Sequence, residues 1–406
     1  FQITEQDLAL SGWRGDEIKQ SKFPILARAS VLGCFDGESL VSQFAVYPVK
    51  MNIHSVIYPV GFVTSVATYP EYAGMGLMSR LMKQSLTDMR ERGRTLALLY
   101  PYSIPLYRKR GWEIISDKMS YRITKGEDLR EQNYMGIHTV GRGSERPPVL
   151  LALDYNPTGD KDAPVFACLV GKGITFDTGG YDIKDDESMS TMKSDMGGAA
   201  AVIGAVLAIA RAGIKANVTA VVAACENRVS GNAYLPGDVL RTMSGKTVEV
   251  INTDAEGRLT LIDAVTYAVQ KENAFAVIDI ATLTGGQVVS LGYRYAALIS
   301  DSKVLTEMIQ KASAACGEKV WQMPADELFL EPMKTSTIAD YRHTGGKGGG
   351  TIAAGLLIRE FAEGRHFAHL DIAGPAFLES EFPGWETGAT GYGVRLLYQT
   401  LRLLAE

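Results

Sequence analysis

The chain has 406 residues, of which 46% are hydrophobic and 42 are glycine, a length that suits two or three domains with substantial cores. A net charge of -5 does not favour a nucleic-acid or anionic-membrane surface. Four widely separated cysteines, no apolar run of roughly 18 residues, and a start unlike a signal peptide predict a cytoplasmic protein without a membrane helix.

The first third of the chain alternates strand-like runs with one long helical pattern. The runs are at residues 25–35, 40–51, 57–69 and 95–101, and the helix spans 76–93. This order predicts a small α+β domain. No Gly/Ser/Pro linker follows it, so we expect an abrupt boundary at about residue 122, giving domains 1–122 and 123–406.

The remainder alternates apolar strands with helices at a regular spacing. The strand-like runs are at 149–155, 165–171, 218–225, 276–283 and 367–374. A helix at 196–213 is rich in small residues and must pack closely. This pattern predicts an α/β fold with a mostly parallel sheet sandwiched by helices.

The segment NTDAEGRL, residues 252–259, places Asp254, Glu256 and Arg258 between a strand-like run and a helical pattern. Taken alone, the two carboxylates fit a solvated turn that favours a helix N-terminus. However, VGKGITFDTGG and MKSDMGGAA add Asp177 and Asp195 at a strand end and a helix start. Four carboxylates meeting at the carboxyl edge of a parallel sheet would repel unless cations lay between them.

This set of four carboxylates contains no histidine or cysteine, and its oxygen ligands suit Mg, Mn or a carboxylate-bridged zinc pair. A two-metal site holds its ions roughly 3.5–4 Å apart and can activate water and polarise a carbonyl. The residues therefore favour a metal site over a solvated turn.

These segments resemble the catalytic domain of the leucine aminopeptidase (cytosol aminopeptidase) family. The resemblance continues through YLPGDVLRTMSGKTVEV, DIATLTGG, AHLDIAG and GATGYGVRLL, and residues 121–184 resemble its peptidase B subgroup. It implies a metalloaminopeptidase that releases N-terminal amino acids from peptides with metal-activated water and two divalent ions, Mn or Zn. It also implies a homo-oligomer, which is a hexamer in the family.

The resemblance also implies a role for each matching residue. The metal ligands would be Lys172, Asp177, Asp195, Asp254 and Glu256. Lys184 would polarise the substrate carbonyl, and Arg258 would hold a bicarbonate ion that acts as the general base.

The substrate positions follow from the same resemblance. Met192, Thr282 and Gly285 match residues that line the side-chain pocket, and Leu283 matches a position whose backbone contacts the substrate. For Met192 and Thr282, ordinary packing is the alternative.

The first domain resembles a GCN5-related N-acetyltransferase of the enhanced-intracellular-survival type, through VTSVATYPEYAGMGLMSRLM and LALLYPYSIPLYRKRGWEI. Gly74 and Gly76 would let the backbone approach the pyrophosphate of acetyl-CoA. Tyr107 would protonate the leaving thiolate. A tight turn and a packed aromatic ring are the respective alternatives.

Three functional hypotheses follow from the whole chain. The first is a dinuclear metalloaminopeptidase with an acetyltransferase-like N-terminal domain. The second is an acetyl-CoA-dependent acetyltransferase on a peptidase-like scaffold, and the third is a non-catalytic interaction protein. About two metal ions per chain are expected only under the first.

Overall fold

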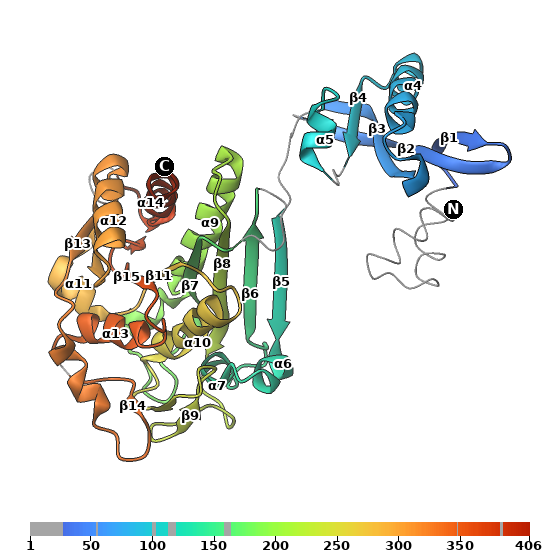
Figure 1. The fold of residues 1–406 in the computed structure, drawn as a ribbon. Coiled ribbons are helices and arrows are strands. Elements are labelled where there is room, and N and C mark those ends of the chain that lie inside the picture. The colour runs from blue at the N-terminus through green and yellow to red at the C-terminus, as the bar shows by residue number, and fades with distance from the viewer. Residues whose placement is uncertain are drawn as a thin grey trace. The chain divides into compact units, whose positions relative to one another are not determined.

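The computed structural model describes most of the chain. The described residues are 27–53, 56–99, 103–112, 119–157, 164–346, 348–381 and 385–406. The chain divides into two compact units, Phe1–Ile115 and Ser116–Glu406. Each has its own sheet and helices (Figure 1), which confirms the α/β class with a smaller N-terminal α+β part.

The first unit is built on a four-stranded sheet with the order β1-β2-β3-β4. Its elements are β1 (Ser30–Asp36), β2 (Ser39–Ile53), β3 (Val56–Thr68), η1 (Pro70–Tyr72), α4 (Leu77–Glu91), β4 (Leu96–Leu99) and α5 (Ile104–Arg108). The first three strands are antiparallel neighbours, whereas β3 and β4 are parallel and connected through α4. α4 buries Leu81, Met82 and Met89 against Phe44 and Val63, which forms a small core.

The second unit is built on an eight-stranded sheet with the order β13-β12-β15-β11-β7-β8-β6-β5. Its strands are β5 (Met119–Lys125), β6 (Val149–Tyr155), β7 (Ala167–Asp177), β8 (Val218–Asn227), β11 (Ala276–Ala281), β12 (Tyr295–Ile299), β13 (Lys319–Gln322) and β15 (His366–Asp371). The central strands β15, β11, β7 and β8 are parallel, and antiparallel pairs flank them at β12 and β6. The sheet is therefore mixed but mostly parallel, as predicted.

The expected boundary at residue 122 lies inside β5. This strand pairs with β6 along its whole length, from Met119 opposite Tyr155 to Lys125 opposite Val149. β5 therefore belongs to the second unit, and the chain divides before it, between Ile115 and Ser116. The independent folding of 1–122 and 123–406 as domains stays a prediction.

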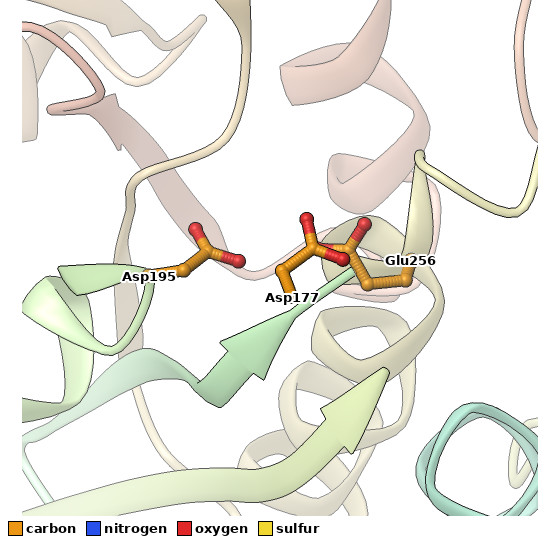
Figure 2. A group of neighbouring side chains, drawn as sticks. All are labelled: Asp177, Asp195 and Glu256. Atoms are coloured by element: carbon orange, nitrogen blue, oxygen red, sulfur yellow. The ribbon is translucent and has the colours of Figure 1, made fainter. Parts of the chain in front are cut away.

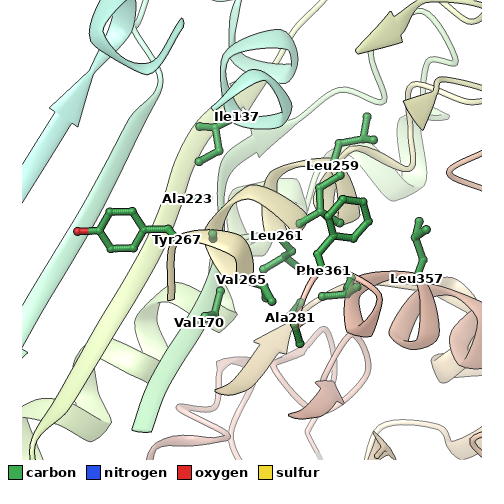
Figure 3. Close-up of a cluster of buried hydrophobic side chains, with 14 of the residues drawn as sticks. Ile137, Val170, Ala223, Leu259, Leu261, Val265, Tyr267, Ala281, Leu357 and Phe361 are labelled. Carbon is green, nitrogen blue, oxygen red and sulfur yellow. The ribbon is translucent and has the colours of Figure 1, made fainter. Parts of the chain in front are cut away.

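Helices cover both faces of the large sheet. They are α7 (Met135–Gly141), α10 (Glu256–Gln270) and α13 (Gly350–Arg359) in one core cluster, and α9 (Gly197–Ala212), α12 (Lys303–Cys316) and α14 (Val394–Ala405) in the other. Figure 3 shows part of the first cluster, where Leu261 and Val265 of α10 lie near Val170 of β7. Strands buried on both faces need apolar side chains at successive positions, which explains the continuous apolar runs.

Shorter elements connect these layers. They are α6 (Gly126–Glu131), α8 (Asp186–Met189), η2 (Met192–Ser194), β9 (Val239–Arg241), β10 (Thr247–Glu249), α11 (Gly285–Leu291), η3 (Glu327–Phe329), η4 (Glu331–Lys334), β14 (Tyr341–Arg342), β16 (Phe377–Leu378) and β17 (Gly388–Ala389). Three of these strands form a small sheet with the order β14-β10-β9. Its strand β10 ends at Glu249, shortly before residues 252–259.

The small residues of α9 allow a close approach to the sheet. A Cβ on Gly198 would lie 2.0 Å from the carbonyl oxygen of Ile280 in β11 and 3.0 Å from the backbone nitrogen of Lys172 in β7. A methyl group cannot fit there, so this helix lies in direct backbone contact with two central strands.

By length and composition alone, one stretch of the described residues, Met192–Ala212, could cross a membrane, with a mean hydropathy of 1.5. No membrane helix was predicted from the sequence. Its α9 portion buries Val202, Val206 and Ile209 in the core under the sheet. Packing against the sheet accounts for its apolar composition, because a core helix has the same character.

The start of α14 is capped by a carboxylate from a different part of the chain. Glu318, 1% exposed, accepts hydrogen bonds from the backbone N–H groups of Gly393 (3.0 Å) and Leu396 (2.8 Å). We expect Glu318→Ala to lower the free energy of unfolding by about 1–3 kcal/mol, because buried donors lose their acceptor. Urea unfolding of the full chain measures this change.

The matched control is Arg395→Ala. Arg395 pairs with the same carboxylate at 3.1 Å, but its side chain is 59% exposed. An exposed ion pair contributes at most about 1 kcal/mol. Equal destabilisation by the two substitutions would contradict the capping role of Glu318.

Candidate metal centre

Three carboxylates meet at the carboxyl end of β7. Asp177 is the last residue of β7, Asp195 lies between η2 and α9, and Glu256 begins α10. One oxygen from each lies within 4.8 Å of the others, and all three side chains are buried. Figure 2 shows these carboxylates coming together from the three elements.

Lys172 of β7 lies in the middle of this group. Its Nζ is 2.9 Å from Oδ2 of Asp195 and 2.7 Å from Oε1 of Glu256. It also donates a hydrogen bond to the carbonyl oxygen of Thr282, 2.9 Å away. The side chain is 4% exposed, so these oxygens take the place of water as partners of the buried ammonium.

The cluster carries more negative charge than the lysine offsets. The pKa of Glu256 is raised to about 8, first by burial and then by the nearby charge of Asp177, and these effects outweigh the lowering by Lys172. Burial likewise raises the pKa of Asp195 to about 6. Burial alone would lower the pKa of Lys172, but the surrounding carboxylates outweigh it and the net shift is upward. The centre therefore favours additional positive charge.

A second lysine joins the remaining predicted ligand to the cluster. Nζ of Lys184 is 3.0 Å from Oδ2 of Asp177 and 2.5 Å from Oδ1 of Asp254. Asp254 is less buried than the other carboxylates, with a side chain 34% exposed. The residues predicted from sequence thus form one connected group of four carboxylates and two lysines.

This group fits divalent cations. Oδ2 of Asp195, Oδ1 of Asp254 and Oε1 of Glu256 are buried, and among the described residues they face only lysine ammonium groups. Carboxylate oxygens in this number suit hard or borderline divalent ions. The donor set is therefore that of a carboxylate-rich metal centre, with the lysines at positions where cations are favoured.

Arg258 lies in the first turn of α10 and is also buried, at 8% exposure. Its Nη1 donates to the carbonyl oxygen of His343 at 2.9 Å, and its Nε has no hydrogen-bond partner among the described residues. Burial lowers the pKa of Arg258 to about 10, so the guanidinium stays charged at neutral pH. A buried cation with an unused donor is suited to bind a small anion.

His343 is a residue that the sequence analysis missed. Its Nδ1 accepts from the backbone N–H of Ile251 at 3.0 Å, and its Nε2 lies 2.8 Å from the carbonyl oxygen of Asn252. Burial lowers its pKa to about 4, so the ring is neutral and bridges both groups. It fixes the loop before Asp254. No motif spacing predicts a contact between residues so distant in the sequence.

A second missed group fixes the turn on the other side. Asn227, the last residue of β8, donates from Nδ2 to Oδ1 of Asp177 at 2.8 Å and to the carbonyl oxygen of Thr253 at 3.0 Å. The hydroxyl of Tyr234 donates to the same carbonyl at 2.7 Å. Asn227 stands at a strand end beside the predicted edge, and this position is the one sequence signal that pointed to it.

The predicted substrate positions lie on two adjoining segments. Met192 is half-buried in η2, and Gly285 is exposed at the start of α11. Leu283 is half-buried and packs on the core. Thr282 donates from Oγ1 to Oδ1 of Asp195 at 2.7 Å, which links the two segments at the cluster. Their contact with a substrate stays a prediction.

Gly257 allows the chain of Lys172 to cross the start of α10. A Cβ at this position would lie 2.5 Å from Cε and 2.8 Å from Nζ of Lys172. We expect Gly257→Ala to displace the lysine and weaken Mn²⁺ binding about 10-fold or more, although alanine itself favours a helix. Calorimetric titration of the metal-stripped chain measures the affinity.

Gly350→Ala at the start of α13 is the control, because a Cβ there meets nothing within 4 Å. It should bind Mn²⁺ as the wild type does. Unchanged affinity in the Gly257 variant would contradict the role of this close approach.

In the first unit, Gly74 and Gly76 have left-handed backbone angles, with φ of +78° and +75°. Gly76 is the N-cap of α4, so the predicted phosphate-binding turn does precede a helix. Tyr107 is buried in the small core, with its ring 6.1 Å from that of Trp112. Burial raises its pKa. This environment agrees with the packed-aromatic alternative, and a catalytic role stays a prediction.

The fold and the cluster define the second unit as a mixed α/β protein with a carboxylate-rich candidate metal centre. The chain belongs to the cytosol aminopeptidase family: residues 99–398 match the model of that family's catalytic domain. Residues 1–115 match the model of the acetyltransferase (GNAT) domain. Both resemblances seen in the sequence are thereby confirmed.

Curated relatives carry aminopeptidase names. A probable cytosol aminopeptidase of Clostridium perfringens is 53% identical over 274 residues, which cover 67% of this chain and 54% of that protein. Peptidase B of Klebsiella pneumoniae is 49% identical over 293 residues, covering 71% of this chain and 68% of that protein. The chain thus spans about half the length of the first relative.

Solved structures show the same fold. The leucine aminopeptidase of Caenorhabditis elegans is 38% identical with a TM-score of 0.65, covering 70% of this chain and 57% of that one. The bottromycin maturation enzyme BotP, in complex with Mn, is 31% identical with a TM-score of 0.67, covering 77% of this chain and 75% of that one.

Proposed function

We propose that this protein is a metal-dependent aminopeptidase that releases N-terminal amino acids from peptides. The observation that carries the proposal is the buried group of Asp177, Asp195 and Glu256 with Lys172 between them. The names of the relatives support the reaction class, and the BotP complex supports Mn as one metal of the family.

Five residues would hold two divalent ions, Mn or Zn. They are Lys172, Asp177, Asp195, Asp254 and Glu256. Ions bound there would supply Lewis-acid activation of water and of the scissile carbonyl. With the ions bound, Lys172 would be a neutral amine, because a metal ligand must offer a lone pair. Nearby dications lower the pKa of an amine, which makes this form accessible.

The other charged residues would act on the substrate and its protons. Lys184 keeps its ammonium beside Asp177 and Asp254, from where it would stabilise negative charge developing on the carbonyl oxygen. Arg258 would hold bicarbonate through its unused Nε donor. The bicarbonate would take the proton from the attacking water, because no histidine is among the neighbours of the cluster in the described chain.

The substrate would extend along the segment after β11. Met192, Thr282 and Gly285 would line the pocket for the first side chain, and the backbone of Leu283 would contact the peptide. The free amino group would be anchored at the metal centre, which would restrict the reaction to terminal residues. We also propose a cytoplasmic homo-oligomer, a hexamer as in the family, in line with the name of the Clostridium perfringens relative.

Peptide cleavage with matched substrates tests this proposal. The protein loaded with Mn²⁺ or Zn²⁺ should release leucine from a short Leu-peptide and contain about two metal ions per chain by elemental analysis. A chelator should abolish cleavage. The same peptide with an acetylated amino group should not be cleaved, and cleavage of both peptides at equal rates would overturn the aminopeptidase assignment.

For the first unit we propose acetyl-CoA binding, with Gly74 and Gly76 beside the pyrophosphate. The favouring observation is the parallel β3–α4–β4 arrangement, with two left-handed glycines before the helix. A thermal shift with acetyl-CoA tests it. Because Tyr107 is packed in the core, we expect little acetyl transfer, and Tyr107→Phe should leave the thermal shift in place.

A further inference from the structure

We propose that Asp371 is a positioning residue of the metal centre, which it stabilises through the Thr282–Thr284 segment without touching the cluster. The role in metal binding follows from geometry, and the consequence for peptide cleavage rests on the proposed function. Neither the sequence motifs nor the names of the relatives assign a role to this residue.

Asp371 is the last residue of β15 and is fully buried. Its Oδ1 accepts from the backbone N–H groups of Leu283 (3.1 Å), Thr284 (3.4 Å) and Ala373 (3.2 Å). Its Oδ2 accepts from the hydroxyl of Thr284 at 2.6 Å. One carboxylate therefore fixes the chain on both sides, after β11 and after β15.

The same segment reaches the cluster through Thr282. Its carbonyl oxygen accepts from Nζ of Lys172, and its hydroxyl donates to Asp195, at 2.9 and 2.7 Å. Lys172 and Asp195 are thus oriented by one residue, and the next two residues along the chain are held by Asp371. The connection from Asp371 to the cluster runs through a single peptide segment.

The sheet itself does not hold this segment. The ladder between β11 and β15 ends at the pair Ala281 and Asp371, and α11 begins only at Gly285. The N–H groups of Leu283 and Thr284 lie in the gap between strand and helix, where a buried donor needs an acceptor. The Asp371 carboxylate provides that acceptor.

Asp371 does not have the surroundings of a metal ligand or a general base. Both of its oxygens are occupied by backbone and hydroxyl donors, whereas Oδ2 of Asp195 and Oε1 of Glu256 face the ammonium of Lys172. A carboxylate that orients ligands in this way typically changes metal affinity or activity about 10- to 100-fold when it is removed.

The test is a calorimetric titration of the metal-stripped full chain with Mn²⁺ alone. Asp371→Ala should weaken Mn²⁺ binding about 10- to 100-fold. Asp371→Asn keeps an acceptor at Oδ1 and an amide that can donate to Thr284, whose hydroxyl can in turn donate to Thr351 at 2.8 Å. It should restore most of the affinity, since the role depends on hydrogen bonds and not on a charge facing the metal.

Two further variants separate positioning from general stability. Glu318→Ala removes another buried carboxylate that accepts two backbone N–H groups, at the start of α14, and should destabilise the fold without changing Mn²⁺ affinity. If Asp371→Ala does not fold, Thr284→Val removes one donor to the carboxylate and should weaken Mn²⁺ binding in the same direction by a smaller factor.

Each outcome bears on the proposal. Wild-type Mn²⁺ affinity in Asp371→Ala, or in Thr284→Val if the former does not fold, would overturn it. So would an equal loss of affinity in Glu318→Ala. A wild type that binds Mn²⁺ but cleaves no peptide would refute only the proposed function, whereas a wild type that binds no Mn²⁺ would refute both.

Discussion

Glu256→Gln is expected to remove bound metal and peptide cleavage together. Glu256 is 1% exposed and its Oε1 faces Lys172 at 2.7 Å, so its carboxylate is at the centre of the cluster. A neutral amide takes away a charge that would offset a divalent ion, and its N–H groups cannot bind one. The loss should exceed the roughly 10- to 100-fold typical of residues that only orient ligands.

Elemental analysis and Mn²⁺ titration of the Glu256 variant measure this loss alongside the rate of Leu-peptide cleavage. Glu331→Gln is the control, because that side chain is 60% exposed and pairs with Lys334 on the surface. Full metal content in the Glu256 variant would contradict its assignment as a ligand, even if cleavage were slow.

Arg258→Ala is expected to behave differently, with metal retained and turnover slowed about 100- to 10,000-fold, the usual loss when a general base or its anchor is removed. The guanidinium is buried and charged, and it donates to the His343 carbonyl, while none of the ion pairs among the described residues joins it to the proposed ligands. Its removal therefore leaves the proposed ligands in place but deletes the anchor for bicarbonate. Steady-state kinetics and metal content together distinguish this result from that of Glu256→Gln.

Added bicarbonate provides the sharper comparison. It should accelerate the wild type more than the Arg258 variant, because only the wild type has a buried cation to hold the anion. Arg258→Lys should recover only part of the rate, since an ammonium lacks the paired donors of a guanidinium. Equal stimulation of wild type and Ala variant would show that Arg258 does not hold the base.

Much of the large sheet was predictable because strands buried on both faces need unbroken apolar runs. The meeting of Asp177, Asp195 and Glu256 was expected because carboxylates at strand ends and helix starts collect at the carboxyl edge of a parallel sheet, although β10, the strand before Glu256, belongs to the small sheet. The position of β5 was not predictable in this way. It is an edge strand that is partly exposed, and only its pairing with β6 shows that it belongs to the second unit.

Of the residues that orient the cluster, His343 and Asp371 could not be predicted from the sequence, and Asn227 had only its place at a strand end as a signal. Asn227, His343 and Asp371 are single polar residues at strand ends or in loops, where polar residues are common for many reasons. Asn227 contacts Asp177 50 positions away, His343 contacts Asn252 91 positions away, and Asp371 contacts Leu283 88 positions away. Motif spacing carries information about neighbours along the chain, whereas these contacts depend on the order of strands in the sheet.

The close approach of α9 to the sheet has a mechanical consequence. Gly198 brings this helix into backbone contact with Ile280 and next to Lys172, and Asp195 stands just before the same helix. Contacts between main chains yield less to strain than contacts between long, flexible side chains, and packed interiors have low compressibility. The spacing between Asp195 and Lys172 should therefore change little with pressure or moderate heating, so that metal selectivity persists until the second unit itself unfolds.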